Sequence, residues 1–291
     1  MNVVFGANGR AGGETARALI ERGAPVKVVV RRPEQGERWR AKGAHVAVAD
    51  LYDTDQVARA LQGATAAFLL SPPPLAGDPF SQATQLGEAL AEAVGRAELA
   101  RVVVQSSVGA QHDAGTGVIA TLHTLEKALA GTAPAIAFLR CGYFVETWSE
   151  VAEAAISEGV LPSFLDVDQR IPMVSTMDIG VAAARLLTEE WQGERIVELS
   201  GPRDWSARDV ATAFANVLGH PVEPVLIPPG QRHGILTDEG VAPEVASALL
   251  GMYDGLASGR VTREQGTANW RGSTPLQTAV KRIVAAVHAA A

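Results

Sequence analysis

The first half of the chain alternates short apolar runs, rich in β-branched residues, with longer segments in which apolar residues recur every three or four positions. Six apolar runs contain almost no polar alternation: 2–5, 26–30, 45–48, 66–70, 101–105 and 135–139. Strands covered by helices on both faces have this pattern, because neither face meets water. The alternation therefore predicts a parallel sheet with a helix after each strand.

The remaining pattern predicts the helices and a second part of the molecule. Helical spacing of apolar residues occurs at 13–22, 53–61, 80–98 and 118–130, and less regularly near 143–157, 178–189, 206–218 and 243–257. Further strands are expected at 195–199 and 222–227. We predict an α/β protein with a Rossmann-type doubly wound parallel sheet in residues 1–150. Residues 151–291 are expected to form a smaller α/β lobe packed beside the sheet, and the chain is free to cross between the two.

The composition narrows the class of protein. The chain has 291 residues, 47% of them hydrophobic, and a formal net charge of -7 with scattered basic residues. This favours a globular protein with a large core and argues against a nucleic-acid surface. The single cysteine, Cys141, excludes an internal disulfide, and no apolar run reaches the ~20 residues of a membrane-spanning helix. Because the first strand begins near residue 2, no signal peptide is expected, and we predict a cytoplasmic protein.

Two common kinds of site find no support in the sequence. The six histidines show no ligand-like spacing, and no Gly-x-Ser-x-Gly motif occurs. We therefore expect neither a metal site nor a hydrolase nucleophile of that type.

The segment GANGRAGG places Gly6, Gly9 and Gly12 directly after the first apolar run. A strand that ends at a glycine, turns at a second and enters a helix at a third is typical of a dinucleotide pyrophosphate site. The first glycine permits the tight turn, the second lets backbone amides approach the phosphates, and the third lets the helix pack close to the sheet. The helix N-terminus then favours the bound anion.

The end of the second strand indicates which dinucleotide binds. An NAD site usually has Asp or Glu there, to accept hydrogen bonds from the ribose 2′-hydroxyl, but here Arg31 and Arg32 follow VKVVV. Two guanidinium groups suit a 2′-phosphate, and Arg10 in the glycine turn could reach the same phosphate. NADP(H) is therefore the expected cofactor. The alternative is that Arg31 and Arg32 are solvated surface charges.

Other strand ends should complete this site. Asp50 and Leu51 follow the third strand, where the adenine ring would lie, although Asp50 could instead cap the next helix. Ser71 and Pro72 follow the fourth strand and should line the nicotinamide ribose. The full set of expected cofactor contacts is Gly6, Asn8, Gly9, Arg10, Ala11, Gly12, Arg31, Arg32, Asp50, Leu51, Leu70, Ser71, Pro72, Ser106, Gly142, Tyr143 and Phe144.

The chain resembles the NmrA-like family of atypical short-chain dehydrogenase/reductases in blocks that occur in the same order over about residues 1–230. These blocks are GANGRAGG, VVVRRP, ADLYD, FLLSPPP, VVVQSS, GTGVIATLHTLEKAL, LRCGYFVETW and PMVSTMDIGVAAARLL. The family includes NADPH-dependent quinone reductases, isoflavone-reductase-like enzymes and non-catalytic NADP-sensing regulators. The resemblance implies a Rossmann domain, a small C-terminal lobe and a substrate bound between them.

The Tyr-x-x-x-Lys pair of ordinary short-chain dehydrogenases is absent, since the fourth residue after each tyrosine is Gln56, Thr147 or Ala257. A ketone reduced by hydride becomes a strongly basic alkoxide, so a positioned acid matters there. A quinone gives a phenolate-like product whose conjugate acid has a pKa near 10, which water can protonate. The missing pair therefore favours quinones or activated double bonds as substrates.

One histidine is a candidate for a substituted pair, because His123 stands four residues before Lys127 on one face of the predicted helix. The resembled family usually has Lys or His four residues before a glutamate, but Leu122 holds that position before Glu126. A catalytic or cofactor-contacting role and a structural role for His123 both remain open. Lys127 is expected to face solvent.

The ends of the fifth and sixth strands complete the expected site. Ser106 and Ser107 could bond a substrate carbonyl or the nicotinamide amide, or could only finish backbone hydrogen bonding. Residues 142–144 should cover the nicotinamide face, with Trp148 near the substrate unless it is core. We therefore expect catalytic roles for His123 and Ser107, and substrate contacts from Tyr143, Phe144 and Trp148.

The leading hypothesis is an NADPH-dependent oxidoreductase that transfers hydride to a quinone or another conjugated carbonyl compound. The main alternative is a non-catalytic NADP(H)-sensing regulatory protein of the same fold, and a weaker one is epimerase or isomerase chemistry. The expected partner is a small molecule, with no nucleic acid and no membrane, and a homodimer is left open.

Overall fold

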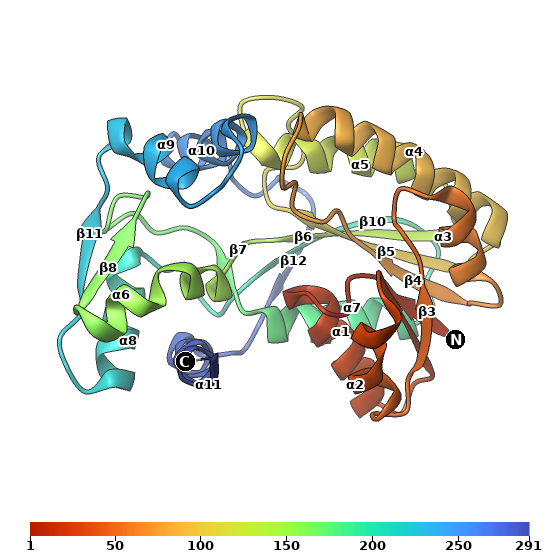
Figure 1. Ribbon diagram of the computed structural model, residues 1–291. Coiled ribbons are helices and arrows are strands. Elements are labelled where there is room, and N and C mark those ends of the chain that lie inside the picture. The colour runs from red at the N-terminus through yellow and green to blue at the C-terminus, as the bar shows by residue number, and fades with distance from the viewer. Residues whose placement is uncertain (291) are drawn as a thin grey trace.

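The computed structural model describes residues 1–290, and its centre is an eight-stranded sheet in which every paired strand is parallel (Figure 1). The strand order across the sheet is β12 (Ala268–Arg271), β10 (Gly193–Ser200), β6 (Ala135–Cys141), β5 (Arg101–Ser107), β4 (Ala66–Leu69), β1 (Asn2–Val4), β2 (Val26–Val30) and β3 (His45–Val48). The order reverses between β1 and β4, which is where open α/β sheets bind ligands. The predicted Rossmann-type sheet and its six N-terminal strands are confirmed.

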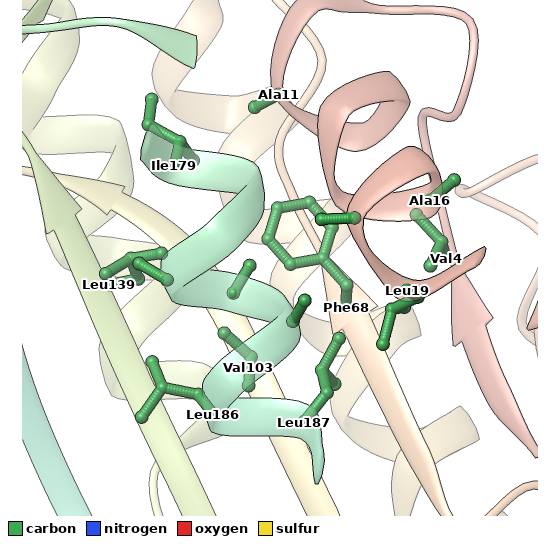
Figure 2. Packing of buried hydrophobic residues seen from close by; sticks show 14 of the residues in the cluster. Val4, Ala11, Ala16, Leu19, Phe68, Val103, Leu139, Ile179, Leu186 and Leu187 are labelled. Atoms are coloured by element: carbon green, nitrogen blue, oxygen red, sulfur yellow. The ribbon is translucent and has the colours of Figure 1, made fainter. Parts of the chain in front are cut away.

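Alternate side chains of these strands enter two different hydrophobic clusters. Val4 and Phe68 pack on one face of the sheet against α1 (Arg10–Glu21) and α7 (Thr176–Thr188), as Figure 2 shows. Val3 and Ala67 point to the opposite face. That face is covered by three helices, α3 (Thr54–Leu61), α4 (Pro79–Ala97) and α5 (Ala120–Leu129). Two buried faces explain why the strands are apolar at every position.

A second lobe lies beyond the C-terminal ends of β5 and β6 (Figure 1). Its strands form two small parallel pairs, β11 (Glu223–Leu226) with β8 (Val160–Ser163) and β7 (Tyr143–Phe144) with β9 (Met173–Val174). Its helices are η3 (Val145–Val151), α6 (Ala152–Ser157), α8 (Ala207–Leu218), α9 (Pro229–Asp238), α10 (Pro243–Ala257) and α11 (Leu276–Ala290). Trp148, Trp205 and Phe214 are buried in the lobe's core.

The chain returns to the sheet after forming part of this lobe. Strand β10, expected at 195–199 to pack beside the sheet, instead pairs with β6 inside it, so that expectation is wrong. Helix α7 and strand β12 also belong to the sheet layers. A division at residue 150 therefore stays a prediction about folding units. The single helix expected near 143–157 is divided into β7, η3 and α6.

Three shorter helices complete the described chain: η1 (Pro33–Gly36), α2 (Glu37–Arg40) and η2 (Gly117–Ile119). No helix among residues 1–290 has the length and apolar content needed to cross a bilayer.

Candidate functional site

The turn after β1 needs glycine at two positions for different steric reasons. Gly6 has a φ of +65°, in the left-handed region that favours glycine, and a β-carbon there would lie 2.6 Å from Leu70 Cδ2. A β-carbon on Gly12 would overlap the carbonyl oxygens of Gly6 and Phe5. Only glycine therefore lets α1 begin this close to the end of β1. The amide of Gly9 closes the turn by donating to the Gly6 oxygen at 2.8 Å.

The N-terminus of α1 leaves room and unused donors for an anion. No side chain caps it, and its first turn holds no acidic residue. The amides of Arg10, Ala11 and Gly12 make no hydrogen bond to another of residues 1–290. A β-carbon on Gly9 would meet only the Gly6 oxygen, at 3.3 Å, so a side chain there would enter open space. This arrangement fits the pyrophosphate of a dinucleotide.

Asn8 positions the turn through its side chain. Its Oδ1 accepts a hydrogen bond from Trp39 Nε1 at 3.0 Å, and its Nδ2 donates to the Gln35 carbonyl at 3.2 Å. Arg38 also donates to the Ala7 carbonyl, at 3.5 Å. Sequence reasoning missed this support, because Trp39 lies in the short helix α2, which no clear apolar period announced. Asn8 thus links the glycine turn to the segment after β2.

The two arginines after β2 differ in their surroundings. Arg32 Nε lies 3.1 Å from Glu34 Oε1, and both side chains are more than three-fifths exposed. The exposed Arg31 guanidinium has no ion-pair or hydrogen-bond partner within residues 1–290. Arg31 is therefore available to an added phosphate, while Arg32 would have to leave Glu34.

Arg10 is directed away from these two arginines. Its guanidinium contacts η3 in the other lobe, at 3.0 Å from Glu150 Oε1 and 3.1 Å from Ser149 Oγ. A third, longer hydrogen bond reaches Thr147 Oγ1 at 3.4 Å. The structure therefore does not place Arg10 beside Arg31, because the acidic and hydroxyl groups of η3 hold its side chain. Arg10 instead joins the glycine turn to the second lobe.

The residues that follow β3 and β4 lie at the ends of these strands, as the sequence predicted. Asp53, not Asp50, caps α3, since its Oδ1 accepts from the Gln56 amide at 2.9 Å, so the capping alternative for Asp50 is wrong. Asp50 is exposed at the end of β3, and Leu51 is partly exposed. Leu70, Ser71 and Pro72 are partly exposed at the end of β4, with Leu70 against Gly6. All these groups lie at the C-terminal edge of the sheet.

Ser106 has a different environment from the one expected. It is 3% exposed, and its hydroxyl donates to Glu126 Oε1 at 2.5 Å. Glu126 is itself buried and paired with Arg140 through distances of 2.9 and 2.6 Å. Arg140 contacts both Glu126 oxygens and Ser106 adds a donor to Oε1, so the three side chains form one buried hydrogen-bonded group. The geometry therefore supports the structural alternative for Ser106, and a cofactor contact from it is not supported.

Ser107 lines a small cavity, together with residues at the start of the second lobe. Its hydroxyl donates to the Val108 carbonyl at 3.0 Å. The cavity lining adds Gly142 and Tyr143 after β6, together with Met252 and Leu256 of α10. Of the two expected catalytic residues, Ser107 thus lines the same cavity as Tyr143, and His123 does not.

His123 holds a loop in place. Its Nδ1 lies 2.9 Å from the carbonyl oxygen of Ala110, in the segment between β5 and α5. This contact supports the structural role that the sequence left open, with Nδ1 carrying the proton. Lys127 is exposed, as predicted.

Residues 142–144 continue β6 toward the second lobe, and Tyr143 and Phe144 diverge there. A β-carbon on Gly142 would lie 2.6 Å from the Pro172 oxygen, so glycine is required where β7 meets β9. Phe144 packs against the sheet cluster beside α1 and α7, whereas Tyr143 packs against the cluster of the second lobe. Trp148 is 5% exposed in that lobe, so it belongs to the core, and its Nε1 has no partner within residues 1–290.

Tyr143 meets a tyrosine that sequence reasoning missed. Its hydroxyl oxygen lies 3.1 Å from that of Tyr253 in α10, 110 positions later in the chain. The Tyr253 ring packs edge-on against Phe164, with centroids 5.2 Å apart. Burial raises the pKa of both tyrosines, so both hydroxyls stay protonated at neutral pH. The result is a partly exposed aromatic surface with a hydroxyl pair.

Close backbone packing fixes α10 over this surface. A β-carbon on Gly117 of η2, which has a φ of +55°, would overlap the backbone of Ala248, Gly251 and Met252. At its start, α10 is joined to the segment after β4, because Glu244 Oε1 accepts from the Gly77 amide at 2.7 Å. Helix α10 therefore covers the C-terminal ends of β5 and β6.

A separate hollow of about 390 Å³ lies between α7 and β12, where Arg185 stacks on Trp270. It does not include the glycine turn or the tyrosine pair. Size alone therefore does not identify the site, whereas the strand-end geometry does.

The fold and the glycine turn define a doubly wound α/β protein of the dinucleotide-binding type. The chain belongs to the NmrA-like family, whose profile matches residues 2–255. The resemblance stated from the sequence blocks is thereby confirmed.

Two curated proteins and one solved structure are similar to this chain. The chain is 28% identical over 223 residues to a (4-alkanoyl-5-oxo-2,5-dihydrofuran-3-yl)methyl phosphate reductase of Streptomyces griseus, covering 76% of this chain and 75% of the relative. It is 26% identical over 226 residues to quinone oxidoreductase 2 of Escherichia coli, covering 76% of each. The crystal structure of a Citrobacter sp. triphenylmethane reductase with NADP(H) superposes with a TM-score of 0.80 at 20% identity, covering 97% of this chain and all of that one. The last comparison shows the shared fold.

Proposed function

We propose that this protein is an NADPH-dependent oxidoreductase that reduces a quinone or another conjugated carbonyl compound. The observation that carries the proposal is the hydroxyl pair of Tyr143 and Tyr253, which lies past the end of β6 on a partly exposed aromatic surface. The open glycine turn follows β1 and lies at the same C-terminal edge of the sheet. The names of two relatives, one a reductase and the other a quinone oxidoreductase, support the same chemistry.

The cofactor site is proposed to use the free amides at the start of α1 for the pyrophosphate and Arg31 for the 2′-phosphate. Asp50 and Leu51 would border the adenine ring, and Leu70, Ser71 and Pro72 the nicotinamide ribose. Bound there, the reduced nicotinamide supplies hydride. Gly142, Tyr143 and Phe144 would cover the reactive face, because they follow β6 at the same edge.

The tyrosine pair is proposed to bind the carbonyl oxygen of the substrate. Since burial raises the pKa of Tyr143, its Oη holds a proton at neutral pH and can donate a hydrogen bond to that oxygen. Tyr253 orients this hydroxyl through the 3.1 Å contact. Hydride and one proton together convert a quinone into a hydroquinone, and the aromatic rings provide apolar surface for a flat acceptor.

An NADP(H)-sensing protein without turnover is the second candidate. The observation in its favour is that His123, expected to be catalytic, and Ser106, expected to contact the cofactor, are instead engaged with Ala110 and Glu126. Both candidates need the same cofactor turn, so cofactor binding by itself does not separate them.

The decisive experiment follows NADPH absorbance with a panel of quinones and enones and measures NADPH binding by calorimetry. We expect NADPH oxidation with at least one acceptor. Gly9→Asp should abolish this activity, because it puts a carboxylate where the pyrophosphate is proposed to bind. The control is Gly95→Asp on the exposed side of α4, which should retain activity. Tight NADPH binding without oxidation of any acceptor would instead support the sensor.

A further inference from the structure

Arg232 of α9 is a buried cation beside the aromatic surface. It is 9% exposed, and its Cζ lies 5.9 Å from the centre of the Phe164 ring. Phe164 contacts Tyr253, which reaches Tyr143 through the hydroxyl pair. This chain of contacts connects the guanidinium with the position proposed for the substrate.

The guanidinium is only partly satisfied by the protein. Its Nε donates to the Ile227 carbonyl at 2.9 Å, which ties α9 to the end of β11. Its two terminal nitrogens have no hydrogen bond or ion pair within residues 1–290, although they are not sealed from solvent. The terminal nitrogens therefore keep donors that a ligand arriving from solvent could use in place of water.

The nearby carboxylate does not supply the missing partner. Burial is the largest cause that raises the pKa of Tyr253. The charge of Glu150 raises this pKa further, whereas the charge of Arg232 lowers it. Glu150 is however held by Arg10, at 3.0 Å. The terminal nitrogens of Arg232 thus lack a counter-ion beside a flat aromatic wall.

We propose that the site takes conjugated carbonyl substrates that carry an oxyanion group, such as a sulfonate, carboxylate or phosphate, and that Arg232 binds this group. The planar fork of a guanidinium presents two parallel donors to such groups, which a neutral acceptor cannot use. The rings of Tyr143, Tyr253 and Phe164 would hold the conjugated part. This inference rests on the proposed function, because it names the substrate class of the same site.

The test compares 1,2-naphthoquinone with its 4-sulfonate as acceptors in the NADPH assay. We expect Arg232→Gln to raise KM for the sulfonate about 10- to 100-fold while changing kcat/KM for the neutral quinone less than about threefold. Arg232→Lys keeps the charge but loses the planar fork, so its KM for the sulfonate should lie between those of the wild type and Arg232→Gln. The matched control is Arg203→Gln, which removes an exposed charge from the same lobe and should change KM and kcat/KM for neither acceptor.

An equal fall in kcat/KM for both acceptors in Arg232→Gln, or no fall for either, would overturn the proposal. If Arg232→Gln melts well below the wild type, Arg232→Lys is used for the same comparison. Binding of naphthalene-2-sulfonate to the NADPH complex, measured by calorimetry in wild type and variant, needs no turnover. A wild type that reduces no quinone contradicts the proposed function, whereas unchanged binding of this sulfonate in Arg232→Lys and Arg232→Gln contradicts the role of Arg232.

Discussion

Gly251 of α10 lies directly on Gly117 of η2, so that a β-carbon built on Gly251 would stand 2.9 Å from the Gly117 Cα. One turn later, a β-carbon on Gly255 would lie 3.1 Å from the Gly115 oxygen. These glycines let α10 rest on the segment before α5 without intervening side chains. Tyr253 lies between them in sequence and points its hydroxyl to Tyr143.

Replacing Gly251 by alanine should therefore destabilise the protein. The added methyl group must displace backbone, and overpacking of this kind costs about 1–3 kcal/mol. The control is Gly95→Ala in α4, where nothing lies within 4 Å and alanine should stabilise by roughly 0.5–1 kcal/mol. Urea denaturation of the two variants checks both signs. Equal stability of Gly251→Ala and wild type would mean that α10 shifts freely.

The cofactor assignment predicts a selective effect at Arg31. Arg31→Ala should weaken NADPH binding roughly 10- to 100-fold, the value of a charge-assisted hydrogen bond of about 1.5–3 kcal/mol, with little change for NADH. Arg22→Ala removes an exposed charge beyond the end of α1 and serves as the control. Calorimetric titration with both nucleotides gives the ratio. Equal weakening of NADPH and NADH in Arg31→Ala would contradict a 2′-phosphate contact.

The tyrosine pair predicts a loss of turnover in Tyr253→Phe and Tyr143→Phe. Each removes a hydroxyl from the pair but keeps the ring, so kcat should fall about 10- to 100-fold with a smaller effect on NADPH binding. Tyr52→Phe removes the hydroxyl of an exposed tyrosine, which is 41% accessible, and should leave kcat unchanged. Steady-state kinetics with the best quinone measures all three. Wild-type turnover in both site variants would exclude the hydroxyls from the reaction.

Burial raises the pKa of the Cys141 thiol, and this predicts a pH-dependent stability. The unfolded thiol ionises near pH 8.5, whereas the folded one keeps its proton. Unfolding therefore becomes easier as the pH rises above 8.5, by about 1.4 kcal/mol per pH unit, and the contribution is complete below that pH. Ionisation of Tyr143 and Tyr253 in the unfolded chain affects the stability only near pH 10 and above.

The measurement compares wild type with Cys141→Ala between pH 8 and 10. The wild type should lose stability more steeply over the upper part of this range, because the variant has no thiol to ionise. Parallel curves for the two proteins would show that the thiol is not protected from ionisation. Ellman's reagent should also fail to react with the folded wild type at pH 8, since Cys141 is 1% exposed.

The sequence predicted the sheet well because its signals are local. Val3 and Val4 enter different cores, so a strand such as β1 must be apolar at every position, and that pattern is visible without a structure. The edge strand β12 was missed for the opposite reason. Its residues are mostly exposed, and no apolar run distinguishes ANWR from a loop.

The cofactor turn was also predictable, since the positive φ of Gly6 and the close approach of Gly12 to the Gly6 and Phe5 oxygens arise within the turn itself. Ser106 shows where that reasoning stops. A serine at a strand end looks the same whether it faces a ligand or a buried carboxylate, and only the packing of α5 placed Glu126 beside it.

The sequence by itself determined the six N-terminal strands of the sheet, the helices α1, α3, α4 and α5 and the glycine turn, because periodicity and backbone conformation depend on residues within a few positions. Only the tertiary structure decided that Tyr253 meets Tyr143 and that Arg232 lies uncompensated beside Phe164. These contacts join segments 68 to 110 positions apart. They depend on how α9 and α10 pack over the strand ends, which no local pattern records.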